Sequence, residues 1–234
     1  MIDFSKRSDQ KELIDRDNIA FADIQQNLKE LDFINTYLGG HAITTEGFEK
    51  LAGQRKDIKV CEIGCGGGDN LNAIYRCCTK KNIHLKPIGI DINPDCIAYA
   101  RKNTFIEDEN FIVADYRTVD FKNDKPDIIF TSLFCHHFSD KELVTMLRWM
   151  KENSKIGFFI NDLQRNPIAY YFIKIGSKFF SRSHLVKNDG PVSVLRGFKK
   201  NEWKSILTNA GITNYSIQWK WAFRYLIISP EGIT

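Results

Sequence analysis

The sequence contains no long apolar run, and this absence limits its class before any motif is considered. No stretch of its 234 residues approaches the roughly 18 apolar residues of a membrane span. Residues 1–7 also lack the apolar core of a signal peptide, so we expect a cytoplasmic protein. Hydrophobic residues make up 43% and charged residues 26%, which is typical of a globular chain that can bury a core.

Cysteine pairs with metal-binding spacing are absent as well. The six cysteines form no C-x-x-C pair and fall inside expected strands and helices. We interpret them as reduced, mostly buried thiols, and we predict no zinc site from them. They are Cys61, Cys65, Cys77, Cys78, Cys96 and Cys135.

Two common nucleotide-binding signatures are incomplete in residues 58–70, although the chain is organised around this stretch. Residues 58–63 are expected to form a buried strand, and the glycines after them a turn that opens a helix. Asp69 stands where a dinucleotide fingerprint has its third glycine, and the Lys-Ser or Lys-Thr pair of a phosphate-binding loop does not follow. An acid at this strand end suits a cationic ligand and would repel a pyrophosphate. The pattern that fits is acid-x-Gly-x-Gly-x-Gly, formed by Glu62, Gly64, Gly66 and Gly68.

This motif resembles the cofactor loop of the class I S-adenosylmethionine-dependent methyltransferases, in which the loop carries the methionine part of the cofactor. The resemblance implies S-adenosylmethionine as cofactor and S-adenosylhomocysteine as product. Asp91 would bind the ribose and Ile92 would pack on the adenine. Asp115 and Tyr116 would lie at the adenine amino group. The cofactor-binding residues implied in this way are Glu62, Gly64, Cys65, Gly66, Gly68, Asp91, Ile92, Asp115, Tyr116 and Leu133.

Apolar periodicity predicts strands that alternate with helices along most of the chain. This order predicts an α/β fold with a doubly wound, Rossmann-like sheet. The resemblance implies seven strands, the last of them antiparallel. After the strand at 58–63, further strands are expected at 86–91, 110–115, 126–133, 156–160, 212–219 and 222–229.

Residues 1–56 are expected to form an N-terminal helical cap ahead of the methyltransferase domain, residues 57–234. Within the cap, the polar residues 1–17 are predicted to be a loose arm, and residues 18–38 a helix that ends at Gly39. This helical part either closes over the cofactor, as in many members of the resembling family, or packs on the sheet edge. His41 either reaches into the substrate site or lies in a surface turn.

Candidate catalytic side chains follow the fourth and fifth expected strands, where ligands bind in open α/β sheets. Methyl transfer from a sulfonium depends mainly on in-line positioning, but a hydroxyl or acidic carbon also needs a base. His136 and His137 are candidates for this base, because residues 133–137 resemble the Leu-His-His stretch of many small-molecule methyltransferases. The alternative is that one histidine only orients the loop. Asp162 is the third catalytic candidate, and Asn161 is assigned to the substrate site.

The same two strand ends disfavour several reactions. Enzymes that methylate nucleobase amino groups carry Asn/Asp-Pro-Pro-Tyr after the fourth strand, where residues 131–134 read Thr-Ser-Leu-Phe. Metal-dependent catechol methyltransferases need an acid at the fourth strand end and Asp-Asn at the fifth, where this chain has Asn161 and Asp162. Nucleic-acid substrates are therefore disfavoured, and no metal is predicted.

Residues 165–198 interrupt the alternation and are predicted to form a helical lid. The stretch 165–200 holds eight basic side chains and one acid, and its apolar residues recur at helical spacing. The lid either covers a hydrophobic substrate, binds an acidic carrier protein or a membrane surface, or only presents solvated lysines. Its predicted substrate contacts are Tyr170, Tyr171 and Arg196, the last for an anionic group.

Together these features predict an enzyme that methylates a small, partly hydrophobic, anionic or phenolic metabolite on oxygen or carbon. The chain looks most like quinone-biosynthesis and polyketide-tailoring methyltransferases. Two alternatives stay open. One is an RNA methyltransferase, which the net charge of +4 favours weakly. The other is a regulator that binds S-adenosylmethionine without catalysis. The oligomeric state is not predicted.

Overall fold

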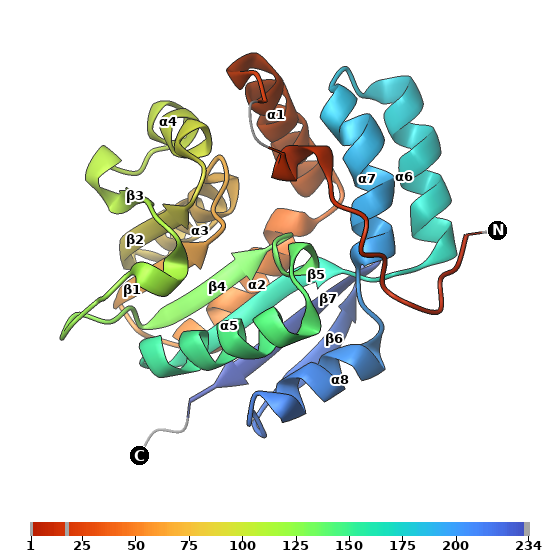
Figure 1. Ribbon diagram of the computed structural model, residues 1–234. Helices are drawn as coiled ribbons and strands as arrows, with labels where there is room; N and C mark the ends of the chain where they lie inside the picture. Colours follow the sequence, from red (N-terminus) through yellow and green to blue (C-terminus); the bar gives the residue numbers. More distant parts are fainter. Residues whose placement is uncertain (1, 17–18, 232–234) are drawn as a thin grey trace.

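A seven-stranded sheet forms the centre of the computed structural model, which describes residues 2–16 and 19–231 (Figure 1). The strand order is β3-β2-β1-β4-β5-β7-β6, and β7 runs antiparallel to both of its neighbours. Strands β1 to β5 are parallel, and the order reverses between β1 and β4, which confirms the predicted doubly wound fold. The strands are β1 (Asp57–Ile63), β2 (His84–Asp91), β3 (Phe111–Val113), β4 (Ile128–Ser132), β5 (Gly157–Leu163), β6 (Ser216–Lys220) and β7 (Arg224–Pro230).

Helices cover both faces of the sheet and one of its ends. Helices α2, α3 and α4 bury their apolar sides on one face, and α5 and α8 on the other. Helices α1, α6 and α7 gather beyond the carboxyl ends of the parallel strands (Figure 1). The helices are α1 (Phe21–Tyr37), α2 (Gly40–Ala52), α3 (Asp69–Lys81), α4 (Pro94–Asn103), α5 (Asp140–Asn153), α6 (Pro167–Phe180), α7 (His184–Arg196) and α8 (Lys200–Asn209).

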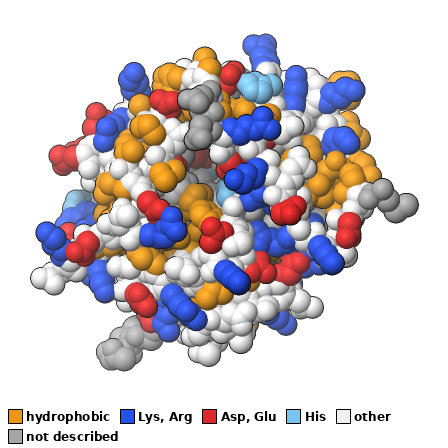
Figure 2. Space-filling model, viewed as in Figure 1, with side chains coloured by type: hydrophobic (Ala, Val, Ile, Leu, Met, Phe, Trp, Pro, Cys, Tyr) orange, Lys and Arg blue, Asp and Glu red, His pale blue; other side chains and the backbone are white. Residues whose placement is uncertain are grey.

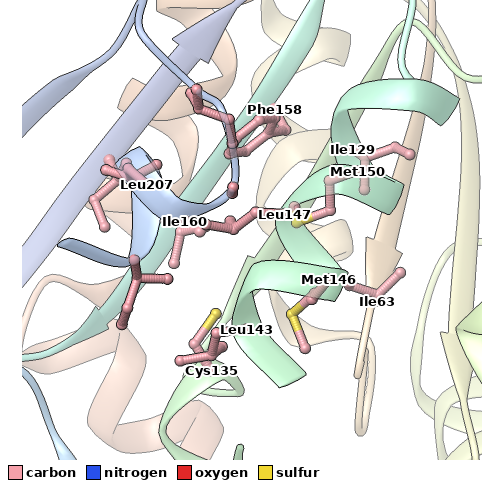
Figure 3. Close-up of a cluster of buried hydrophobic side chains, with 14 of the residues drawn as sticks. Ile63, Ile129, Cys135, Leu143, Met146, Leu147, Met150, Phe158, Ile160 and Leu207 are labelled. Carbon is pink, nitrogen blue, oxygen red and sulfur yellow. The ribbon is translucent and has the colours of Figure 1, made fainter. Parts of the chain in front are cut away.

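The α5 side of the core shows how local sequence signals fix an element. Ser139 caps the helix by accepting from the Glu142 amide, and its own amide donates to the Glu142 carboxylate over 2.8 Å. The apolar stripe that follows is fully buried and packs on β4, β5 and α8 (Figure 3). This stripe consists of Leu143, Met146, Leu147 and Met150.

Two differences from the predicted boundaries bear on the site. Gly39 ends α1 with a φ of +79°, as predicted, but a second helix, α2, begins at once and was not predicted. Strand β5 runs to Leu163 and so contains Asn161 and Asp162, which were expected beyond its end. The predicted helix start at residue 18 lies outside the described residues.

Within the described part of the chain, no helix is long and apolar enough to cross a membrane.

Candidate active site

A cavity of about 1580 Å³ lies at the carboxyl ends of the parallel strands. The loops after β1, β2, β3 and β4 form its floor. Its walls come from α1, α6 and α7, together with residues 12–16 of the N-terminal arm. Because the sheet order reverses between β1 and β4, this is the crevice where doubly wound folds bind their ligands.

Glu62 on β1 gives the floor a buried, incompletely satisfied carboxylate. The side chain is 1% exposed, and its Oε2 atom has no hydrogen-bond partner among the described residues. Burial raises the pKa of Glu62 well above its ordinary value, and the carboxylates of Asp69 and Asp91 raise it further. A buried hydrogen-bond acceptor that no N–H or O–H group meets costs free energy. The Glu62 Oε2 atom is therefore suited to accept a hydrogen bond from a cationic group of a ligand.

The turn after β1 is shaped by the loop after β4. Gly64 has a φ of +66°, and a Cβ there would lie 2.3 Å from the Phe134 ring. Only glycine therefore fits under this aromatic side chain. Leu133 also takes a positive φ, +52°, a conformation that is strained for a residue with a side chain. The strained turn places Phe134 over the glycine loop and carries His136 and His137 to the cavity wall.

Asp91 at the end of β2 joins two of these loops. Its Oδ2 accepts from the Gly66 amide over 2.8 Å, and its Oδ1 accepts from the Asn93 amide over 2.9 Å. Burial raises the pKa of Asp91. Each carboxylate oxygen keeps a second lone pair for a ligand hydroxyl. Farther along the cavity, Asp115 pairs with Arg117, whose hydrogen bonds lower the pKa of the Asp115 carboxyl.

Two imidazoles and three carboxylates meet beside the end of β4. His136 Nδ1 lies 2.8 Å from Asp162 Oδ1, and His137 Nδ1 lies 2.9 Å from Asp15 Oδ1. An imidazole that donates from Nδ1 leaves Nε2 as its acceptor when neutral. Both Nε2 atoms point at the Glu12 carboxyl. His136 Nε2 lies 3.5 Å from Glu12 Oε1, and His137 Nε2 lies 3.9 Å from Glu12 Oε2.

The ionisation of these carboxyls differs. Glu12 is 3% exposed, and burial raises its pKa to about 7. Burial also acts on Asp162, but the charge and hydrogen bond of His136 and the amides of Cys135 and Leu163 outweigh it and hold its pKa below the ordinary value. Asp162 is fully buried and does not line the cavity, so it positions the His136 ring rather than touching a ligand.

The N-terminal arm that supplies Glu12 and Asp15 is held in place by α7. The amides of Leu13 and Ile14 donate to the two carboxylate oxygens of Asp189 over 2.8 and 3.0 Å. Arg196 donates to the carbonyls of His136 and Gln10 over 2.8 and 2.7 Å. The prediction of a loose arm is therefore wrong, because its partners lie far away in the sequence and leave no trace in its local composition.

The cavity wall formed by α1 and the insert is apolar, and Leu28 of this wall lies against the glycine loop, where a Cβ on Gly66 would stand 3.5 Å from Leu28 Cδ2. Most of its side chains come from α1 and from the insert, and Figure 2 shows hydrophobic side chains gathered over α6. The predicted helical insert is present as α6 and α7, and its action as a lid stays a prediction. The apolar wall includes Ile24, Leu28, Leu31, Ile34, Phe172, Ile173, Ile175, Val186, Val194 and Phe223.

Comparison with known proteins places the chain in a family. Residues 54–211 match a family model described as a methyltransferase domain. The chain belongs to this methyltransferase family. Over 144 residues the methyltransferase is 29% identical to phosphoethanolamine N-methyltransferase 1 of Arabidopsis thaliana, a match that covers 58% of this chain and 26% of that protein. It thus spans about a quarter of this curated relative.

Solved structures share the fold of the methyltransferase at low identity. Human N-acetylserotonin methyltransferase matches with a TM-score of 0.66 and 14% identity, over 91% of this chain and 57% of that one. A plantazolicin methyltransferase matches with a TM-score of 0.64 and 16% identity, over 88% and 91%. A methyltransferase from Aquifex aeolicus matches with a TM-score of 0.61 and 18% identity, over 88% of this chain and 97% of that one. The predicted class I methyltransferase is confirmed at the level of family and fold.

S-adenosylmethionine is the methyl donor that the family and the fold imply, and the floor of the cavity fits it. The orphaned Glu62 oxygen suits an ammonium group, and the Asp91 carboxylate suits ribose hydroxyls. Apart from Gly68, every predicted cofactor residue lines the cavity of the methyltransferase. Gly68 instead begins α3, with a φ of +73°. When bound, the donor supplies an activated methyl group on a sulfonium.

The predicted substrate contacts do not line the cavity. Asn161 is fully buried and donates to the Gly40 carbonyl, because it lies within β5 and not beyond it. Tyr170 packs edge-on against Phe4 of the arm, and Tyr171 is half exposed on the outer side of α6. Placing these three residues in the substrate site was therefore wrong.

The two remaining predicted substrate contacts, His41 and Arg196, are also engaged elsewhere. His41 Nε2 lies 2.8 Å from Asp69 Oδ2, outside this cavity. Arg196 holds the arm, as described, and its side chain does not reach the cavity wall. Both side chains were predicted to contact the substrate. Instead, His41 is held by Asp69, and Arg196 is held by backbone carbonyls of the arm and of the loop after β4.

One buried cation that lines the cavity was not predicted from the sequence. Arg224 at the start of β7 is 2% exposed, and its Nη2 donates to Asn35 Oδ1 over 3.0 Å. Its Nε and Nη1 atoms have no partner among the described residues, and burial lowers its pKa to about 10. The available signal was an arginine in an otherwise apolar closing strand. Glu12 and Asp15 were missed as well, because nothing near them in the sequence indicates a site.

Proposed function

We propose that this methyltransferase transfers the methyl group of S-adenosylmethionine to an oxygen or carbon of a small, partly hydrophobic metabolite that is anionic or phenolic. One observation carries the proposal: a single cavity joins the donor floor, the apolar wall and the polar cluster around His136. A substrate with an aromatic or alkyl body would lie against α1 and α6. Its polar end would then face the two histidines.

The residues divide the work of positioning. Glu62, Asp91 and Asp115 hold the donor, while Phe134 separates the glycine loop from the histidine cluster. Asp162 fixes the ring of His136 so that Nε2 faces the cavity side. Methyl transfer from a sulfonium needs mainly an in-line approach, and a deprotonated acceptor strengthens the nucleophile.

Arg224 supports an anionic substrate. It is a buried guanidinium with two unpartnered nitrogens on the cavity wall, and such a group binds a carboxylate well. It takes the role for which the sequence suggested Arg196. The relatives and solved neighbours act on varied small molecules, judged by the names N-acetylserotonin, phosphoethanolamine and magnesium protoporphyrin IX, which agrees with a small-molecule acceptor.

A labelled-donor assay tests the proposal. Hydroxybenzoates, alkylphenols and hydroxyquinones are incubated with labelled S-adenosylmethionine, beside RNA transcripts as a separate arm. We expect label in a phenolic or acidic small molecule, and a loss of about 10²–10⁴ in rate for His136→Gln. His41→Gln, outside the cavity, is the matched control. Label in RNA alone, or tight donor binding without any transfer, would replace the proposal by the RNA enzyme or the regulator.

A further inference from the structure

The histidine cluster has the layout of a metal site. His136, His137 and Glu12 present one ligand atom each, and these atoms all lie within 4.8 Å of one another. They come from two places in the chain, the loop after β4 and the N-terminal arm. No local pattern in the sequence indicates this cluster, because the third side chain lies more than a hundred residues from the histidines.

The distances within the cluster do not correspond to hydrogen bonds. His136 Nε2 is 3.5 Å from Glu12 Oε1, and His137 Nε2 is 3.9 Å from Glu12 Oε2. N–H···O hydrogen bonds are shorter, at about 2.7–3.2 Å. With metal–ligand distances of about 2.0–2.2 Å, the ligand atoms of a tetrahedral zinc site stand about 3.3–3.5 Å apart. The cluster is thus slightly wider than a filled site.

An unpartnered buried atom points into the cluster. Glu12 is 3% exposed, and its Oε1 has no hydrogen-bond partner among the described residues. The nearest guanidinium, that of Arg196, stays 3.9 Å away from this oxygen and donates to carbonyls. A buried carboxylate oxygen without a donor is costly unless a cation meets it.

The surroundings of the two imidazoles match those of metal ligands. Each ring gives its Nδ1 to a carboxylate, His136 to Asp162 at 2.8 Å and His137 to Asp15 at 2.9 Å. Such carboxylate–histidine pairs fix the tautomer and turn Nε2 toward the ion. A second cluster of Asp32, His41 and Asp69 lacks this arrangement, since His41 Nε2 already sits 2.8 Å from Asp69 Oδ2.

We propose that Glu12, His136 and His137 bind one divalent transition-metal ion, of which Zn²⁺ is the best fit to two imidazoles and a carboxylate. Three protein ligands leave a fourth position open, which is the pattern of catalytic rather than structural zinc. All three residues line the cavity, so this position faces the substrate space. With an ion on its Nε2, His136 would not itself take the proton, and the ion would instead make a bound acceptor hydroxyl release its proton to solvent more readily; this consequence rests on the proposed function.

Metal binding is measured on the full-length protein without donor or acceptor, so it does not depend on the reaction. Chelator-treated protein is titrated with Zn²⁺ against a chromophoric chelator, and with Co²⁺ for its visible spectrum. We expect one ion per chain, a tetrahedral Co²⁺ spectrum without a thiolate charge-transfer band, and a Zn²⁺-dependent rise in the melting temperature. No bound ion, or a thiolate band, would overturn the proposal.

Variants locate the ion. Glu12→Gln and His137→Gln should weaken Zn²⁺ binding by more than a hundredfold, and Asp15→Asn by about 10–100-fold. His41→Gln, in the second cluster, should bind as the wild type does. Circular dichroism of each variant separates lost ligands from lost folding. Wild-type affinity in Glu12→Gln, or lost binding in His41→Gln, would contradict the assignment whichever acceptor the methyltransferase uses.

Discussion

Replacing Glu62 by Gln should move stability and donor affinity in opposite directions. The carboxylate is buried with one unpartnered oxygen, so it burdens the ligand-free fold and attracts a cationic ligand. Glutamine keeps the size but removes the charge and replaces one acceptor oxygen by an NH2 group that donates. We therefore expect Glu62→Gln to be more stable than the wild type without ligand and to bind S-adenosylmethionine less tightly.

The affinity loss can be sized from the contact that disappears. A hydrogen bond between charged groups contributes about 1.5–3 kcal/mol. Its loss corresponds to roughly a 10- to 150-fold higher Kd. Calorimetry with S-adenosylmethionine and S-adenosylhomocysteine measures it. Glu49→Gln, at an exposed carboxylate paired with Lys81, is the control and should change neither quantity.

The stability gain should depend on pH. The pKa of Glu62 is raised in the folded protein and is about 4.3 in the unfolded chain. Folding therefore takes up a proton between these two values, and the stability of the wild type falls as the pH rises through this window. The advantage of Glu62→Gln should grow from pH 5 to pH 8, measured by denaturant unfolding. An unchanged Kd, or a variant that is less stable than the wild type at pH 8, would refute this reasoning.

Three further tests, with four substituted residues, address the remaining parts of the cavity and the basic face of α6. Asp91→Ala should weaken donor binding by about 1–3 kcal/mol through lost ribose contacts, and unchanged affinity in calorimetry would exclude that role. Arg224→Gln should raise the KM of a carboxylate acceptor about tenfold. A higher Kd for S-adenosylmethionine with an unchanged KM would instead assign Arg224 to the binding site of the methyl donor. Charge reversal at Lys174 and Lys178 should raise KM at low salt only, or weaken binding to an acidic carrier protein or anionic vesicles, because salt screens exposed charges. No change in any of these assays would leave the basic face as a solvated surface.

Local signals made parts of the fold predictable. The Ser139–Glu142 capping box and the glycine loop act over a few residues, so the sequence alone locates the start of α5 and the donor floor. Strand ends are less local. The expected end of β5 at Ile160 falls three residues early, because β7 pairs with it as far as Leu163. That error moved Asn161 and Asp162 from the core to the predicted site.

The polar cluster was only half predictable. His136 and His137 follow a strand end, which sequence reasoning can find, but their partners come from the arm. Glu12 and Asp15 are placed by Asp189, which lies about 175 residues away. Helix α2 was missed for a simpler reason. A glycine pair indicates that a helix stops, but it does not show that another helix begins immediately after it.

The division of the cavity between two sets of segments bears on how such an enzyme can diversify. The donor floor belongs to the ends of β1, β2, β3 and β4, whose backbones are fixed by the sheet. The rest of the cavity wall belongs to the arm, to α1 and to the insert of α6 and α7. None of these segments adds a strand to the sheet. Mutations there can reshape acceptor choice while the donor side is inherited unchanged. Exchange of residues 163–198 between related enzymes is therefore a practical route to new acceptors. The N-terminal arm must be exchanged together with this segment, because Asp189 of the segment binds the amides of Leu13 and Ile14 in the arm.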